Sequence, residues 1–193
     1  MNNLRVLLGI PGLVLALGPA ASAQAPSRAD AVRAAVHPVA DAQQMQGWLL
    51  RVPVTRDFPN DFGATLRGHG SAFEIEMTSA PGCVPCGDLW RKLAALGTRY
   101  GWRVRVLNRQ EALMRSGRLG LPWVGHPVAW ARPLADTGRT IPIAVGTDHS
   151  QNLARNLYLA AKMLTGVRPA VGVRAMSKFT GIVGVSAPVT GRR

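Results

Sequence analysis

The sequence from Phe73 to Cys86 reads FEIEMTSAPGCVPC. Its first five residues alternate apolar and acidic side chains, which is the period-two pattern of a β-strand. After the second cysteine, apolar residues recur at the three- and four-residue spacing of one helix face, namely at Leu89, Leu93, Leu96 and Tyr100. This predicts a helix over residues 87–100 that ends at Gly101. The stretch therefore leads from a strand through a loop into a helix, with two cysteines at the junction.

The sequence that follows predicts further strands and helices in alternation. Period-two patterns indicate strands at residues 102–107, 128–130 and 141–145, and the last two are joined by turn residues at 136–138. Helical spacing indicates a short helix at 110–118 and a longer one at 149–164. From residue 72 the order is strand, helix, strand, short helix, strand, strand, helix. We therefore expect the α/β class, with a hairpin near the end of the sheet.

The two flanks of this region look different. Residues 24–70 are interpreted as an N-terminal extension outside the core, with a possible strand at Trp48–Val52. They are a possible dimerisation segment, so a homodimer is a hypothesis. Residues 166–193 are rich in Gly, Pro, Val and Arg and lack acidic residues, which predicts a flexible basic tail. The expected organised domain spans residues 71–165.

The first residues have the parts of a secretory signal. Arg5 supplies a positive charge, an apolar segment follows at Val6–Leu17, and Ala21-Ser22-Ala23 is a small-x-small cleavage site. We expect residues 1–23 to be a signal peptide and the mature protein to be periplasmic. The apolar segment is short and broken by Gly9, Pro11 and Gly12. An uncleaved signal that serves as an anchor is the one membrane association left open.

Composition limits the classes of partner. The chain has 193 residues, of which 47% are hydrophobic, and this is enough for one domain with a core. The formal net charge of +13 would suit an anionic partner such as nucleic acid. However, arginine far outnumbers lysine, and no run of five basic residues occurs. We therefore interpret the charge as a compositional bias and expect no specific nucleic-acid binding.

The spacing of Cys83 and Cys86 is typical of a redox dithiol. A cysteine at a helix N-terminus meets unpaired backbone amides and the positive end of the helix dipole, which stabilise its thiolate. Cys83 would then attack a disulfide, and Cys86, one turn later, would resolve the mixed disulfide.

Two other roles for the cysteines remain open. One is half of a zinc site, although there is no second C-x-x-C and the histidines (His37, His69, His126 and His149) lack ligand spacing. The other is an inert bridge, which would constrain little because the closed loop is so short. We expect no metal and no cofactor.

The strand, the loop, the Cys83-Val84-Pro85-Cys86 motif and the helix after it resemble the active-site segment of thioredoxin-fold proteins. Pro85 before the second cysteine matches that pattern. The resemblance also implies a cis-proline that faces the dithiol and opens the next strand, and Pro127, after His126, lies at a similar spacing. Pro122 is a rival for that position, and an ordinary turn at His126-Pro127 is the other alternative. The resemblance covers about residues 72–165 and implies a thioredoxin-like fold.

The resemblance suggests roles for further residues. Thioredoxins bury a carboxylate beneath the dithiol as a proton acceptor, and Glu76 would match it, with a pKa raised by burial. The alternative is that Glu74 and Glu76 face solvent. His126 and Pro85 would lie beside the substrate, and Trp123 would line a peptide groove. The sequence departs from the family at Gly82, where thioredoxins have an aromatic residue.

These observations favour a periplasmic thiol–disulfide oxidoreductase, a reductase or isomerase of protein disulfides that works with a redox partner protein. An alternative is a thioredoxin-like interaction component of an envelope assembly, such as a conjugation or secretion apparatus. A third hypothesis is a reductase of apo-cytochrome cysteines.

Overall fold

The computed structural model describes residues 36–118, 125–167 and 180–184. Several predictions lie outside these ranges. They are the signal peptide at 1–23, the beginning of the extension, Pro122 and the groove residue Trp123.

The centre of the molecule is a four-stranded mixed sheet with the strand order β3-β2-β4-β5. Strand β2 runs parallel to β3 and antiparallel to β4, and β4 runs antiparallel to β5. Two parallel neighbours need a long connection, and here a helix supplies it between β2 and β3. The strands are β2 (Phe73–Met77), β3 (Arg103–Val106), β4 (Val128–Pro133) and β5 (Ile141–Val145).

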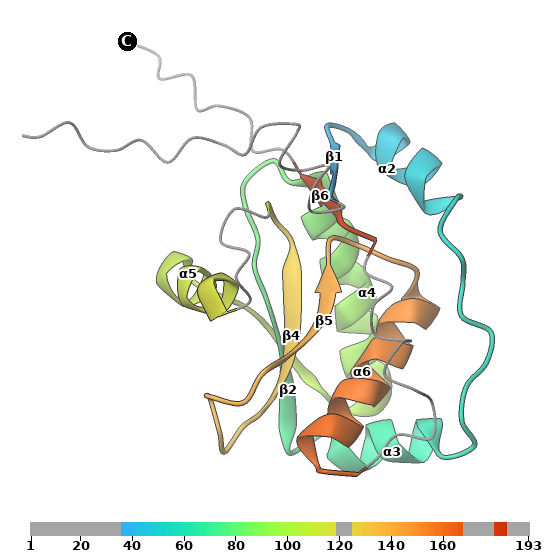
Figure 1. Cartoon of the computed structure of the whole chain (residues 1–193), viewed down its shortest axis with the longest axis vertical. Coiled ribbons are helices and arrows are strands. Elements are labelled where there is room, and N and C mark those ends of the chain that lie inside the picture. Colours follow the sequence, from blue (N-terminus) through green and yellow to red (C-terminus); the bar gives the residue numbers. More distant parts are fainter. Residues whose placement is uncertain (1–35, 119–124, 168–179, 185–193) are drawn as a thin grey trace, which may run out of the picture.

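Helices cover both faces of this sheet, so the α/β class expected from the sequence is confirmed. Helices α4 (Val84–Tyr100) and α6 (Ser150–Leu164) pack on one face, and α5 (Arg109–Arg118) lies over the other (Figure 1). Alternate residues of β2 and β4 supply the two cores: Ile75 and Ala131 face α4 and α6, whereas Val128 and Trp130 face the side of α5. Each strand and helix predicted from residue 73 to 164 is present, with shifts of a few residues at its ends.

The expected strand at Trp48–Val52 is wrong, because Trp48 and Leu49 belong to helix α2 (Ala42–Leu49). Asp41 caps this helix: its side-chain oxygen accepts a hydrogen bond from the Gln44 amide at 2.8 Å. Met45 and Leu49, four residues apart, form its buried face. The helix is short and its buried positions are few, so the apolar run that ends it looks like a strand.

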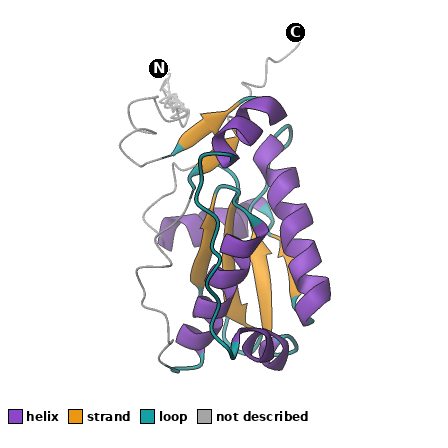
Figure 2. Cartoon of the chain, turned by 90° about the vertical axis from the view of Figure 1, so that its right-hand side faces the viewer, coloured by secondary structure: helices purple, strands orange, loops and turns teal. Residues whose placement is uncertain are grey.

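A second short helix, α3 (Phe62–His69), corrects the interpretation of residues 47–70 as lying outside the core. Its Leu66 is completely buried in the main hydrophobic cluster, and the indole Nε1 of Trp102 donates to the Leu66 carbonyl at 2.8 Å. The loop before α3 is also fixed, since Asn152 of α6 accepts from the Thr55 amide and donates to the Pro53 carbonyl. Figure 2 shows this loop running along the surface of the helices.

The predicted tail is not uniformly flexible, because it contributes a strand. β6 (Ile182–Gly184) pairs in parallel with β1 (His37–Val39), at the end of the molecule where α2 lies (Figure 1). Ile182 is completely buried and packs with Val39 and residues of α2.

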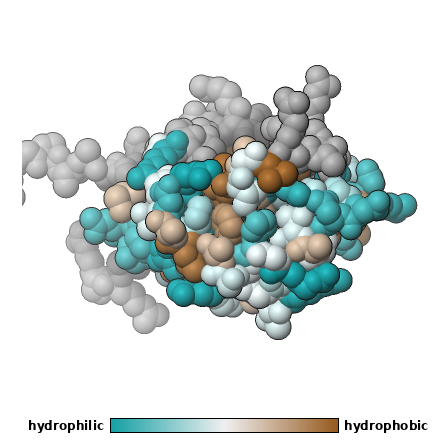
Figure 3. All heavy atoms as spheres, turned by 90° about the horizontal axis from the view of Figure 1, so that it is seen from below, coloured by the Kyte–Doolittle hydropathy of each residue, from teal (hydrophilic) through white to brown (hydrophobic). Residues whose placement is uncertain are grey.

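The opposite end of the molecule, viewed in Figure 3, is mostly polar, with small apolar areas. Within the described ranges, no helix combines the length and the apolar character needed to cross a membrane.

Candidate functional site

Cys83 and Cys86 form a disulfide at the start of α4, with their Cα atoms 5.3 Å apart. Cys83 is the N-cap residue, and Val84 and Pro85 are the first two residues of the helix. Proline suits this position because the first amides of a helix have no partner within it. The Cys86 amide closes the turn by donating to the Cys83 carbonyl at 3.1 Å. The pair therefore lies where the positive end of the helix dipole would stabilise a thiolate.

The two sulfurs differ in accessibility. Cys83 is partly exposed, whereas Cys86 is buried, with 3% of its surface accessible. An external thiol therefore meets Cys83 first, which fits the order of attack and resolution expected for this motif.

The residue before Cys83 explains one departure from the thioredoxin pattern. Gly82 has a φ angle of 70°, in the left-handed region that glycine adopts without steric cost. The Cys83 amide donates to the Ala80 carbonyl at 3.3 Å, so residues 80–83 form a turn. An aromatic side chain at position 82 would be strained in this conformation.

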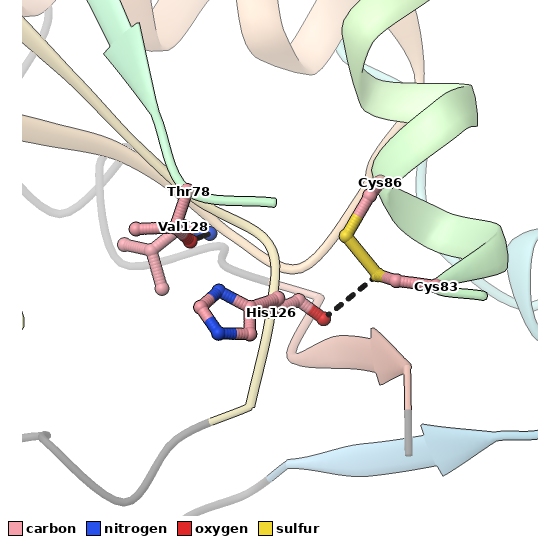
Figure 4. The surroundings of a disulfide bond; sticks show 5 residues. All are labelled: Thr78, Cys83, Cys86, His126 and Val128. Carbon is pink, nitrogen blue, oxygen red and sulfur yellow. Dashed lines mark hydrogen bonds between the residues drawn. A yellow bond between two sulfur atoms is a disulfide. The ribbon is translucent and has the colours of Figure 1, made fainter. Parts of the chain in front are cut away.

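The loop that faces the disulfide contains a cis peptide bond between His126 and Pro127, as the resemblance implied. Figure 4 shows the His126 carbonyl oxygen pointing at Cys83, and this oxygen lies 3.5 Å from the Cys83 Sγ. A disulfide sulfur has no proton to donate, so in this state the approach is a contact only. In the reduced protein the Cys83 thiol has a hydrogen-bond acceptor at this oxygen.

The ring of His126 points the other way, toward Thr78 and Val128 (Figure 4). Burial lowers its pKa, so the imidazole is neutral at neutral pH and brings no positive charge to the dithiol. Its Nδ1 is buried and has no partner among the described residues. The carbonyl of His126, and not its ring, is therefore the part of this residue that contacts the Cys83 sulfur.

Two hydrogen bonds fix the end of this loop, where β4 begins. The Thr78 amide donates to the Val128 carbonyl at 2.8 Å, and the Val128 amide donates to the Thr78 hydroxyl at 2.9 Å. Thr78 directly follows β2 and is buried. The end of β2 and the start of β4 are thereby held together beside the dithiol.

The charge environment of Glu76 differs from the one expected. It is completely buried and accepts hydrogen bonds from three arginines, which are Arg105, Arg115 and Arg132. Burial alone would raise its pKa, but the hydrogen bonds and charges of these arginines outweigh that effect and lower it. The expected raised pKa is wrong, and so is the alternative of solvent-facing acids, because Glu74 is buried as well. A carboxylate with a lowered pKa is a poor acceptor for a thiol proton.

Sequence reasoning missed two buried acids, one near the start of α4 and one shortly after β5. Asp88, two residues after Cys86, accepts from the Thr147 hydroxyl at 2.6 Å and from Lys92 at 2.5 Å. Asp148 accepts from the His149 amide and from Asn152, while its Oδ2 has no partner in the described structure. Burial raises the pKa of Asp148. The sign of these acids in the sequence was the pair of polar residues, Thr147 and Asp148, that comes shortly after an apolar strand.

The third missed residue is Gly184 of β6. A Cβ atom on Gly184 would lie 2.9 Å from the Cys83 Sγ and 3.2 Å from its Cα, too close for any side chain. The Gly184 amide also donates to the His126 carbonyl at 2.8 Å. No sequence motif marks this residue, because its partners are more than fifty positions away.

Comparison of the chain with protein-family models, curated proteins and solved structures gives no match. The site must therefore be interpreted from its own geometry. The described residues contain no cluster of three or more His, Cys, Asp or Glu side chains that could hold a metal ion.

Proposed function

We propose that this chain is a thioredoxin-like thiol–disulfide oxidoreductase that exchanges disulfides with protein substrates. The observation that carries the proposal is the pairing of a C-x-x-C disulfide at the N-terminus of α4 with the cis-Pro127 loop that faces it. The element order β2-α4-β3-α5-β4-β5-α6 around the mixed sheet supports the resemblance.

The reaction would begin at Cys83, the more accessible sulfur. Its thiolate attacks one sulfur of a substrate disulfide, so that a Cys83–substrate bond forms and one substrate thiolate leaves. The Cys86 thiolate then attacks the Cys83 Sγ, which restores the Cys83–Cys86 bond and releases the second substrate thiolate. Two electrons pass from the dithiol to the substrate, and a thiol donor must restore the dithiol. The reverse sequence oxidises a substrate dithiol.

The first test is the reduction potential of the Cys83–Cys86 pair, measured by equilibration of the mature protein with glutathione buffers. We expect a reversible couple between about −120 and −270 mV, the range of known oxidoreductases. A bond that cannot be reduced or re-formed in these buffers would contradict the proposal and favour an inert bridge.

The second test separates the roles of the two cysteines in reduction of a protein disulfide such as insulin. Cys83→Ser should abolish turnover, and Cys86→Ser should accumulate a mixed disulfide, seen as a mass increase on the intact protein. Ser79→Ala, at an exposed position of the same loop, is the matched control and should retain activity. Equal losses of turnover without any mixed disulfide would contradict the assignment of Cys83 as the attacking residue.

We also propose that the protein acts in the periplasm, on the strength of the signal-like residues 1–23. Expression of the full chain followed by sequencing of its N-terminus tests this. A mature protein that begins at Gln24 and lies in the periplasmic fraction is the expected result, and an intact Met1 in the cytosol would contradict it.

A further inference from the structure

The structure places a strand of the chain itself against the attacking cysteine. The main chain of Gly184 lies so close to Cys83 that the missing Cβ would overlap the Sγ. In Figure 4, β6 passes beside the disulfide and the His126 loop. Cys83 is therefore covered on one side by an extended backbone that comes from the far end of the sequence.

The Gly184 main chain bonds to the same carbonyl that contacts the Cys83 sulfur. The Gly184 amide donates to the His126 carbonyl, whose oxygen also lies 3.5 Å from the Cys83 Sγ. The contact is an antiparallel β-bridge between His126 and Gly184, and a second bridge joins Thr147 to Ile182. Residues 182–184 therefore bridge two segments, the His126 loop before β4 and the residues after β5, as an added β-strand would.

An incoming polypeptide that delivers a disulfide to Cys83 needs the same space. It must bring its main chain next to Cys83, where Gly184 now lies, and the outward-facing carbonyl of His126 is already bonded. A small disulfide needs only the part of Cys83 that is exposed. The two kinds of substrate should therefore differ in how they depend on β6.

The two ends of β6 are held unequally. Ile182 is completely buried, and its backbone fits against Gly146, where a Cβ would lie 2.3 Å from the Ile182 nitrogen. Gly184, by contrast, has no side chain to anchor it. The Gly184 end is held by its backbone alone, through the hydrogen bond to the His126 carbonyl and the pairing with Val39 of β1, so its displacement breaks backbone pairing but removes no Gly184 side chain from a packed site.

We propose that Gly184 and its strand occupy the substrate-strand position at Cys83, so that a protein substrate reacts only after this end of β6 has been displaced. Small disulfides react without that displacement. The proposal rests on the oxidoreductase function above and adds to it a discrimination between the disulfides of extended polypeptides and small disulfides.

The test uses the full mature chain with Cys86→Ser, which leaves Cys83 as its single thiol. Two reagents are compared: dithiodipyridine, and an extended peptide whose one cysteine carries a pyridylthio group. Cys83 displaces thiopyridone from either reagent and forms a mixed disulfide, and the absorbance of thiopyridone gives the rate. Each rate is divided by the rate of the same reagent with glutathione. We expect the normalised peptide rate to be lower by about tenfold or more, since only the displaced fraction reacts.

Gly184→Val, added to the same background, introduces the overlap with Cys83 and should bring the peptide rate close to that of the small reagent. Gly117→Val is the matched control, because a Cβ at this exposed position of α5 meets nothing within 4 Å. It should leave the rate ratio unchanged.

Hydrogen exchange supplies a measurement that does not depend on the Gly184 variant. The Gly184 amide should lose protection in the peptide adduct and keep it in the small adduct. The Leu107 amide, which donates to the Met77 carbonyl at 2.8 Å, should stay protected in both. Equal normalised rates, or a Gly184 amide that stays protected in the peptide adduct, would overturn the strand proposal alone. A Cys83 that reacts with neither reagent would contradict both this proposal and the oxidoreductase function.

Discussion

The buried acids of β2 are held by charged residues from other elements. Glu76 lies opposite Arg105 in the register of β2 and β3, and Glu74 lies opposite Arg132 of β4. Cross-strand neighbours of opposite charge stabilise a sheet. Because these charges are buried, removal of one would leave the others without a compensating charge. The result is an ionic layer beneath α5, which also contributes Arg115. This layer stabilises the sheet, and because its arginines lower the pKa of Glu76 the carboxylate is a poor proton acceptor.

Replacement of Glu76 tests the ionic layer. Glu76→Gln keeps the shape of the side chain but leaves three arginines without their shared charge, so we expect a loss of about 3–5 kcal/mol in the free energy of unfolding at pH 7. Because the arginines lower the pKa of Glu76, its contribution is complete above its ordinary value of 4.5 and is lost as the pH falls through the folded-state value.

Urea denaturation of both proteins at several pH values checks this. The difference between wild type and variant should be largest at neutral pH and should shrink in acid. The control is Asp57→Asn, at an exposed position, which should change little. A wild-type advantage that does not change with pH would contradict the assigned charge state of Glu76.

Asp148 should show the opposite dependence on pH. Burial raises its pKa above the ordinary 3.8, so the ionised form is penalised in the folded protein and stability falls as the pH rises through this range. Asp148→Asn removes the charge, and its side-chain oxygen can still accept from His149 and Asn152. We expect a higher melting temperature than wild type at pH 7.

Thermal unfolding monitored by circular dichroism measures this effect. The advantage of Asp148→Asn should disappear near pH 3, where the wild-type carboxyl is protonated too. An Asp148→Asn variant that melts at a lower temperature than wild type at pH 7 would mean that the charge of Asp148 stabilises the folded protein.

At the scale of elements, the helices and strands with long periodic patterns could be predicted from the sequence, and those with short patterns could not. β2 and α4 carry strong periodic signals over five and seventeen residues, and both appear as the sequence indicated. Helices α2 and α3 have eight residues each and few buried positions, so their periodicity is short. β6 has three residues, which is too few for any alternation to be recognised. Its position depends on pairing with β1, and neither segment indicates its partner.

Helix α3 offers a test of where the core begins. Leu66 is completely buried against the main cluster, so Leu66→Ala should lower the free energy of unfolding by about 2–5 kcal/mol. Leu50→Ala, at a residue that is 86% exposed, is the matched control and should change it by less than about 0.5 kcal/mol. Urea denaturation of the two variants gives both values. A Leu66 variant as stable as the control would mean that the segment before β2 does lie outside the core.

At the scale of the whole molecule, the candidate site combines parts that the sequence reveals to different degrees. The Cys83–Cys86 pair could be predicted because it is a local motif, and the cis-proline was implied by the resemblance to thioredoxin-fold proteins. The lowered pKa of Glu76 could not, since its arginines come from β3, α5 and β4. The position of Gly184 could not be predicted either, because its contact with Cys83 arises only when β6 has paired with β1 in the folded protein.

The pairing of β1 with β6 also sets an order in time. His37 and Ile182 pair although they lie far apart in sequence, so this contact can form only after all the residues between them have been synthesised. Both cysteines leave the ribosome long before Gly184 does. During that interval Cys83 has no strand beside it and is open to the thiols and disulfides around it. A strand that emerges well after both cysteines thus completes the surroundings of the reactive sulfur.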